Sequence, residues 1–239
     1  SNKIVYFNNL DTIRFFAAMM VFISHAMSKS FNHLKIEDSI IEKTLFVISN
    51  GAMGVSIFFV LSGFLITYLL VTEIELNGKI DLKKFYMRRF LRIWPLYFAV
   101  IIFSFFLYPM VKTFLGVNVE LGSNFIYHLF FLSNFDVLNI SQNCYGLNAM
   151  SQNITWSVSV EEQFYLFWPL VFFLPKKIWV YTFTSLIVFS LCFRVYNSEI
   201  DYVNYFHTFS VLIDLVIGGL FALTIKQYSS VKKLFEKTN

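Results

Sequence analysis

The feature that most constrains this chain is a series of long apolar segments separated by short polar connections. One of them, residues 45–71, reads LFVISNGAMGVSIFFVLSGFLITYLLV and contains no charged residue. A helix of about 20 apolar residues is long enough to cross a bilayer. The 239-residue chain is 57% hydrophobic and only 14% charged, whereas a soluble domain carries about 25% charged residues. The sequence therefore predicts an all-α, polytopic transmembrane helical bundle.

We expect about six or seven membrane helices and one short piece. The piece FIYHLFFL, residues 125–132, is shorter than the ~20 residues of a crossing helix, so it is predicted to be re-entrant or interfacial. A polar loop is predicted over residues 133–155. No connection is long enough to hold a soluble domain, so residues 1–239 are expected to form a single membrane domain. The predicted spans are residues 10–27, 45–71, 93–114, 156–174, 178–193 and 206–225.

The distribution of cations predicts the orientation. A basic connection over residues 72–92 carries six Lys and Arg residues, and such connections usually face the cytoplasm. The N-terminus is then cytoplasmic too. If the 125–132 piece does not cross, Lys176, Lys177 and the lysine-rich tail face the cytoplasm as well. The first apolar run carries Arg14 and has no small-residue cleavage site behind it, so no cleavable signal peptide is expected.

Composition and residue spacing exclude several classes of function. The net charge of +4 is expected to act on orientation and on acidic lipid headgroups of the bilayer, and no nucleic-acid motif is present. Cys144 and Cys192 lack metal-ligand spacing, and a bridge between a polar loop and an apolar run is not expected. No metal site is predicted, because no HxxH or HExxH pattern links the four histidines, His25, His33, His128 and His207.

The first apolar helix carries two ionisable residues, Arg14 and His25, which are eleven positions apart. At about 100° per residue they share one face, with ~16 Å between them along the axis. His25 lies ~22 Å from the start of the helix at the same rise. An ionisable pair inside a membrane helix indicates a functional site. The alternative is that Arg14 reaches the interface and His25 is hydrogen-bonded between helices.

Three arginines, Arg88, Arg89 and Arg92, stand at positions i, i+1 and i+4 beside the third apolar segment. A cation run at a membrane edge usually sets topology. Guanidinium groups also bind phosphates bidentately, so the run is a candidate phosphate site. Trp94 and Pro95 are predicted to lie near the start of the following helix.

A second polar string, WSVSVEEQ at residues 156–163, opens the fourth span. In a helix, Ser157, Glu161 and Tyr165 lie on one face, while Ser159 and Glu162 lie on a neighbouring stripe. Acids in the first turn of a helix would also be favoured by its dipole. That effect explains one carboxylate but not the whole string, which begins with Trp156.

Two further polar residues lie inside apolar segments. Ser62 accompanies Gly51, Gly54 and Gly63, and small residues at such spacings allow close helix packing in membranes. Packing and chemistry are equally supported for it. Asp214 precedes a glycine pair in the last span, where it can line a cavity or bond across helices.

Four strings, in order, resemble the signatures of the bacterial acyltransferase 3 family. They are LDTIRFFAAMMVFISHA, GVSIFFVLSGFLI, FYMRRFLRIWPLY and TWSVSVEEQFYLFWPL. Members are integral membrane enzymes that move acyl groups, commonly acetyl, onto sugar hydroxyls of surface polysaccharides and related acceptors. The resemblance covers nearly the whole chain. It implies an O-acyltransferase of the bacterial cytoplasmic membrane, with acyl-CoA, in particular acetyl-CoA, as donor substrate and no permanently bound cofactor.

The resemblance also implies roles for residues. His25 would be the catalytic base or the acyl acceptor, as imidazole titrates near neutral pH. Arg14 would offer charge to a donor phosphate or to the oxyanion. Glu161 is a further catalytic candidate. Arg88, Arg89 and Arg92 would bind the phosphates of acyl-CoA. The candidates for substrate binding or support are Trp156, Ser157, Ser159, Glu162, Ser62 and Asp214.

Two positions and the length depart from the family pattern. Thr12 stands where a glycine is common and Ser56 where an aspartate is common, which casts doubt on any role for an acid at position 56. Family members usually have more spans, so the acyltransferase domain is expected to be incomplete at its C-terminal end. Two alternatives therefore remain: a transporter or lipid- or glycan-handling protein that uses intramembrane charges, and an inactive truncated fragment.

Overall fold

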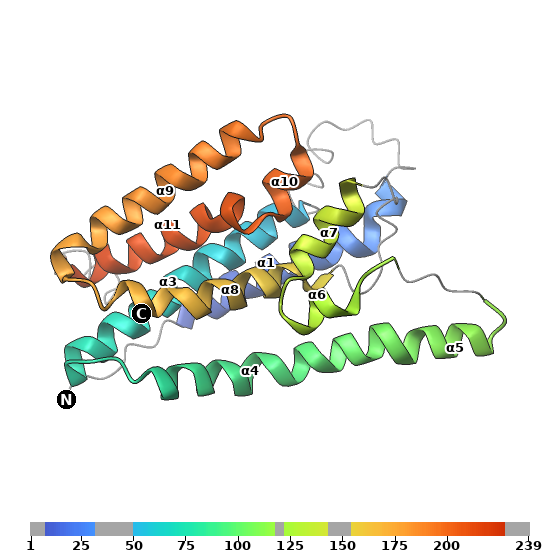
Figure 1. Ribbon diagram of the computed structural model, residues 1–239, viewed down its shortest axis with the longest axis horizontal. Helices are drawn as coiled ribbons and strands as arrows, with labels where there is room; N and C mark the ends of the chain where they lie inside the picture. The colour runs from blue at the N-terminus through green and yellow to red at the C-terminus, as the bar shows by residue number, and fades with distance from the viewer. Residues whose placement is uncertain (1–7, 32–49, 118–121, 143–153, 228–239) are drawn as a thin grey trace. The chain divides into compact units, whose positions relative to one another are not determined.

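The computed structural model describes residues 8–31, 50–117, 122–142 and 154–227, and all regular structure in these ranges is helical. The predicted all-α class is therefore confirmed for this part of the chain (Figure 1). Predictions about Cys144, His33 and the lysine-rich tail fall outside the described ranges. Contacts divide the chain into two compact units, Ser1–Thr72 with Ile213–Asn239, and Glu73–Leu212. The single membrane domain stays a prediction.

The first unit is built from α1 (Asn8–Phe31) and most of α3 (Gly51–Asn77) and α11 (Thr208–Gln227). Its core includes Phe64 and Tyr68 of α3 together with Ala222 and Ile225 of α11. The α3 and α11 backbones touch at a glycine of each helix. These contacts confirm that small residues permit close approach of the helices.

The second unit contains α4 (Leu82–Ile102), which continues through a π-helical turn, η1 (Phe103–Leu107), into α5 (Tyr108–Phe114). Figure 1 shows these three as one long rod. Ser104 and Phe105 of the π-turn are buried. The remaining elements of the unit are α6 (Phe125–Leu129), α7 (Ser133–Gln142), α8 (Trp156–Val171), η3 (Lys176–Ile178), α9 (Trp179–Tyr196) and α10 (Asp201–Phe206).

The predicted basic connection over residues 72–92 is wrong in large part, because most of it is helical. Helix α3 continues to Asn77, and after a turn at Gly78 (φ 73) helix α4 begins at Leu82. Asp81 caps α4 by accepting a hydrogen bond from the Lys84 N–H at 3.0 Å, the usual signal of a helix start. Pro95 therefore lies inside α4 and not near its first turn.

The predicted polar loop over residues 133–155 is also wrong within the described residues. Residues Ser133–Gln142 form α7, and its Val137 and Leu138 are buried. Three polar residues of α7 are buried as well, namely Ser133, Asn134 and Asp136. Helix α7 therefore lacks the apolar stripe by which a helix is predicted from sequence. The preceding piece, residues 125–132, contains only the five-residue helix α6 and a turn in which Phe131 has φ 55. Its re-entrant position stays a prediction.

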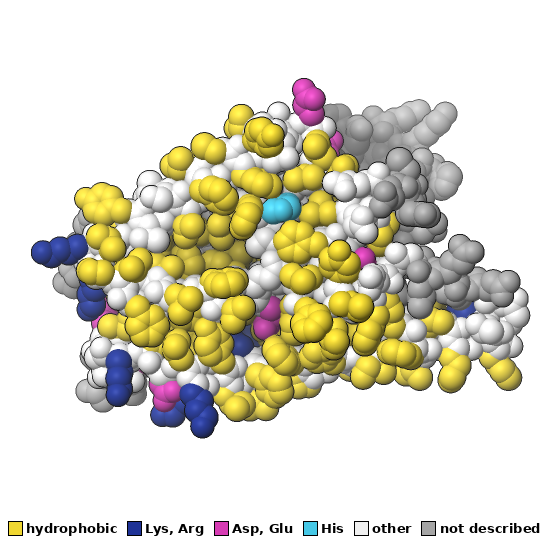
Figure 2. Space-filling model, in the orientation of Figure 1, with side chains coloured by type: hydrophobic (Ala, Val, Ile, Leu, Met, Phe, Trp, Pro, Cys, Tyr) yellow, Lys and Arg dark blue, Asp and Glu magenta, His cyan; other side chains and the backbone are white. Residues whose placement is uncertain are grey.

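Four helices among the described residues are long and apolar enough to cross a membrane: Gly51–Asn77, Leu82–Phe114, Lys176–Tyr196 and Asp201–Gln227. They indicate a multi-pass membrane protein, and Figure 2 shows hydrophobic side chains over much of the visible surface. The count of six or seven is not confirmed. Helix α8 has only 16 residues, fewer than the ~20 of a crossing helix, and α1 is polar at both ends, which shortens its apolar stretch.

Candidate functional site

The three arginines of α4 point to different surroundings. Arg88 is exposed and pairs with Glu73 of α3, with 3.3 Å between Nη2 and Oε2. Arg92 is exposed. Arg89 is half-buried, and its guanidinium lies over the Phe85 ring at 5.1 Å. The three arginines therefore do not form one site: Arg88 and Arg92 point outward from α4, and Arg89 points inward.

Arg89 faces a cavity of about 540 Å³ in the second unit, which we call the α4–α8 cavity. Its volume lies within the ~300–1,000 Å³ range of small-molecule sites. The apolar part of the lining consists of Met87, Phe90, Trp94, Phe130, Phe131 and Leu166. The side chains with polar groups are Lys83, Tyr86, Arg89, Glu162, Gln163 and Tyr165.

The two predicted carboxylates, Glu161 and Glu162, lie in the second turn of α8, and no acid occupies its first turn. The helix dipole is therefore not the reason for their position. Glu162 accepts a hydrogen bond from Trp94 Nε1 at 2.9 Å, and Glu161 accepts one from Tyr165 Oη at 3.3 Å. Glu162 thus reaches the α4–α8 cavity directly, while Glu161 touches a residue that lines it.

The other members of the WSVSVEEQ string contact different elements of the second unit. Trp156 is buried against Tyr205 and Phe206. Ser157 is half-buried on α8. Gln163 donates from Nε2 to the Phe131 carbonyl at 2.7 Å, which holds the wall of the cavity formed by the α6–α7 turn. The string therefore ties α8 to other elements of the unit.

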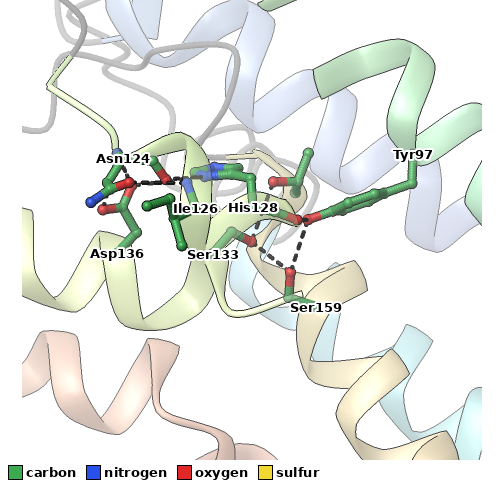
Figure 3. A network of polar contacts seen from close by, with 8 residues as sticks. Tyr97, Asn124, Ile126, His128, Ser133, Asp136 and Ser159 are labelled. Atoms are coloured by element: carbon green, nitrogen blue, oxygen red, sulfur yellow. Dashed lines mark hydrogen bonds and ion pairs between the residues drawn. The ribbon is translucent and has the colours of Figure 1, made fainter. Parts of the chain in front are cut away.

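A buried polar network, which the sequence did not predict, lies in the second unit (Figure 3), and its Tyr97 stacks on Phe131 of the cavity lining. Tyr97 Oη donates to the His128 carbonyl at 2.8 Å and lies 3.4 Å from Ser159 Oγ. Ser159 Oγ and Ser133 Oγ are 2.7 Å apart, and Thr155 donates to Ser133. Hydroxyl groups that serve as both donor and acceptor allow such a chain to be satisfied without water. Ser159 is thus placed in the interior of the unit.

At the other end of this network, Asp136 is 2% exposed and His128 is fully buried. The Asn124 N–H donates to both carboxylate oxygens of Asp136, at 3.3 and 3.1 Å. His128 Nδ1 lies 3.9 Å from Asp136 Oδ2. Burial raises the pKa of Asp136 above its ordinary value, although the Asn124 N–H and the nearby His128 act in the opposite direction.

This shift makes a prediction about stability. Because the folded pKa is above the unfolded one, the folded protein binds the proton more tightly. The resulting stabilisation is present below the unfolded pKa and is lost as pH rises through the folded pKa. We expect wild type to lose stability relative to Asp136→Asn as the pH rises. Thermal unfolding of both proteins in detergent, from about pH 4 to pH 7, measures this difference. A wild type that gained stability relative to the variant would contradict the assignment.

Arg14 and His25 belong to α1 in the first unit. The Arg14 side chain, 30% exposed, pairs with Asp11 at 3.3 Å. His25 is exposed, and its Nδ1 lies 2.8 Å from the Val21 carbonyl oxygen. A carbonyl only accepts, so Nδ1 carries the hydrogen, and in the neutral ring Nε2 keeps its lone pair. Because α1 is continuous from Asn8 to Phe31, the predicted shared helix face holds.

Ser62 and Asp214, the remaining predicted site residues, lie on α3 and α11 of the first unit, and both are half-buried. Their neighbours Gly63 and Leu215 form the close contact between these helices. Of all predicted site residues, the structure brings Arg89 and Glu162 together around one cavity. His128, Asp136, Ser133 and Tyr97 were missed, because they are scattered along the sequence and meet only in the fold.

Comparison with known proteins identifies relatives. The acyltransferase domain model of the acyltransferase 3 family matches residues 7–237. The peptidoglycan O-acetyltransferase OatA of Listeria monocytogenes is 40% identical over 137 residues, which cover 54% of this chain and 21% of that protein. The O-acetyltransferase OatA of Staphylococcus aureus is 31% identical over 252 residues, which cover 97% of this chain and 37% of that protein.

An uncharacterized protein of Haemophilus influenzae is 38% identical over 123 residues, covering 51% of this chain and 49% of that protein. No solved structure matches. This chain therefore spans less than half of the length of these three relatives. The match to the family model nonetheless extends over nearly all of it, from the helix of Arg14 and His25 to the end of α11. The chain belongs to the acyltransferase 3 family.

Proposed function

We propose that this protein is a membrane O-acyltransferase that moves an acyl group, acetyl in the first instance, from acyl-CoA to a hydroxyl of a cell-surface sugar. Family membership and the names of its relatives support this assignment. The relative named as a peptidoglycan O-acetyltransferase makes a peptidoglycan sugar the first acceptor to test. The bacterial cytoplasmic membrane, with the N-terminus in the cytoplasm, is the proposed location.

The observation that carries the chemistry is the hydrogen bond between His25 Nδ1 and the Val21 carbonyl. It leaves Nε2 of the neutral ring as a proton acceptor. In the proposed reaction, Nε2 takes the proton of the acceptor hydroxyl while the oxygen attacks the thioester carbonyl. The C–S bond then breaks, and the thiolate of coenzyme A takes the proton back from the imidazolium. In the alternative order, His25 first takes the acyl group as an acyl-histidine and then passes it to the acceptor hydroxyl.

Arg14 would stabilise negative charge on a phosphate of the donor, because at ~16 Å along the axis from His25 it is too far away to contact the oxyanion that forms beside Nε2. It shares the face of His25 on the continuous helix α1. Its salt-bridge partner, Asp11 on the preceding turn, is exposed. An exposed salt bridge contributes little free energy, so a ligand anion can replace Asp11 at small cost. Arg14 therefore remains available to a substrate.

The donor phosphates are proposed to bind at the start of α4. Arg88 and Arg92 are exposed there and stand one helical turn apart, so both forks can reach one pyrophosphate. Arg89 points into the α4–α8 cavity and is not proposed to contact the donor. Glu161 and Glu162 are proposed to support this region by holding Tyr165 and Trp94 in place.

A binding and hydrolysis assay tests the proposal. Purified protein should bind coenzyme A and should slowly hydrolyse acetyl-CoA without an acceptor. The double variant Arg88→Gln/Arg92→Gln should weaken binding by about tenfold or more, because two charge-assisted contacts are lost. Lys176→Gln, an exposed cation on η3, is the matched control and should bind normally. A transporter should neither bind coenzyme A nor release it from the thioester, and that result would contradict the proposal.

A further inference from the structure

The α4–α8 cavity extends along one face of α4, from Lys83 to Trp94, which donates a hydrogen bond to Glu162. Five of the six α4 residues that line the cavity recur at helical spacing and form one stripe, namely Lys83, Tyr86, Met87, Phe90 and Trp94, and Arg89 lies beside this stripe. Lys83 and Trp94 are eleven residues apart, or ~16 Å along the axis at 1.5 Å per residue. Lys83 lies nearest the N-terminal end of the candidate span Leu82–Phe114, Arg89 follows further along the helix, and Trp94 lies deepest.

The lining carries a net positive charge. Lys83 and Arg89 outnumber Glu162, the one carboxylate in the lining. The Arg89 guanidinium is oriented by the Phe85 ring at 5.1 Å and the Tyr165 ring at 5.9 Å. One oxygen of Glu162 is occupied by Trp94. The mouth of the cavity is therefore suited to a single anionic group.

The inner wall is apolar and fixed. The Phe131 ring stacks on Tyr97 at 4.4 Å and packs against Trp94 at 5.1 Å. The backbone of Phe131 is held by Gln163. Along the outer side, Phe90 and Leu166 are 43% and 55% exposed although both line the cavity. The cavity therefore opens sideways, which in a bilayer means toward the lipid chains.

We propose that the α4–α8 cavity binds one anionic phospholipid of the surrounding bilayer. Its phosphate would contact Lys83 and Arg89, and one acyl chain would lie along Phe90, Trp94 and Phe131. Basic pockets between membrane helices on the cytoplasmic side bind acidic headgroups in this way. The proposed donor site uses the outward Arg88 and Arg92, so the lipid would occupy a separate site, and the inference goes beyond acyl transfer.

Native mass spectrometry of the purified full chain provides the test. The protein is equilibrated with phosphatidylglycerol and phosphatidylcholine of identical chains, and the retained lipid is counted. Wild type should favour phosphatidylglycerol by about fivefold for each contacting cation. Arg89→Gln should lose about fivefold or more of this preference, while Arg89→Lys keeps it. Arg92→Gln is the matched control, because Arg92 stands one turn away and does not line the cavity.

Two measurements keep the proposal falsifiable if Arg89→Gln does not fold. Leu166→Trp, which fills the cavity but leaves its charges, should reduce retention of both lipids. On wild type, an excess of coenzyme A or of inorganic phosphate should leave the lipid bound. Equal retention of the two lipids, an equal loss in Arg92→Gln, or displacement by either competitor would overturn the proposal. None of these results depends on acyl transfer, so a failure here leaves the proposed function to its own test.

Discussion

Replacing His25 by alanine is expected to lower acyl transfer by at least about 100-fold, the smaller end of what a general acid–base group contributes. The variant should lose the Nε2 lone pair that the Val21 hydrogen bond leaves available. The measurement is release of coenzyme A from acetyl-CoA by purified protein, together with O-acetyl esters on surface glycans of cells carrying the variant. If His25 instead receives the acyl group, the loss should be as large, since no acyl-histidine forms.

The control for this prediction must separate chemistry from folding. Phe22→Ala also removes an exposed ring from α1, about one helical turn before His25, and it leaves the imidazole in place. This variant should transfer acyl groups at nearly the wild-type rate. Both variants should give the same elution volume and helical circular dichroism in detergent. If His25→Ala retained more than about one tenth of the activity, catalysis by this group would be excluded.

The helical class could be predicted from the sequence because long apolar runs admit few alternatives in a bilayer. The helix starts were harder to predict. The cations before residue 93 predict a connection, yet α4 begins at Leu82, directly after the Asp81 cap. Long Arg and Lys side chains can extend from a helix into polar surroundings while their stems cover apolar surface. A charged stretch beside an apolar segment is therefore compatible with helix.

The candidate site was predictable only where one helix holds all its parts. The shared face of Arg14 and His25 follows from helical spacing alone, as does the pairing of Glu161 with Tyr165. The network of Tyr97, Ser133 and Ser159 does not, because three separate elements contribute to it. Polar residues that are far apart in sequence give no periodic signal, and their contacts depend on tertiary packing.

Gly63→Ala is expected to destabilise the first unit strongly. A β-carbon on Gly63 would overlap the Leu215 carbonyl group, and Gly218 of α11 stands in the same relation to the Val60 carbonyl of α3. Backbone atoms cannot rotate away as a flexible side chain does, so the helices must separate. Overpacking of this kind costs about 1–3 kcal/mol, which would lower the unfolding temperature by several degrees.

Gly51→Ala is the matched control for this substitution. It lies on the same helix, but its added methyl would crowd only the Ser24 side chain, with Oγ at 2.7 Å and Cβ at 2.8 Å. Oγ can rotate away, and Cβ needs a small shift of α1, whereas the methyl of Gly63→Ala overlaps backbone atoms of Leu215. Thermal unfolding of detergent-solubilised protein should therefore rank the variants as wild type, Gly51→Ala and then Gly63→Ala, in order of decreasing stability. A Gly63→Ala protein as stable as Gly51→Ala would mean that α3 and α11 do not meet at these glycines. The close approach of the two backbones, and with it the placement of Ser62 and Asp214 beside that contact, would then be wrong.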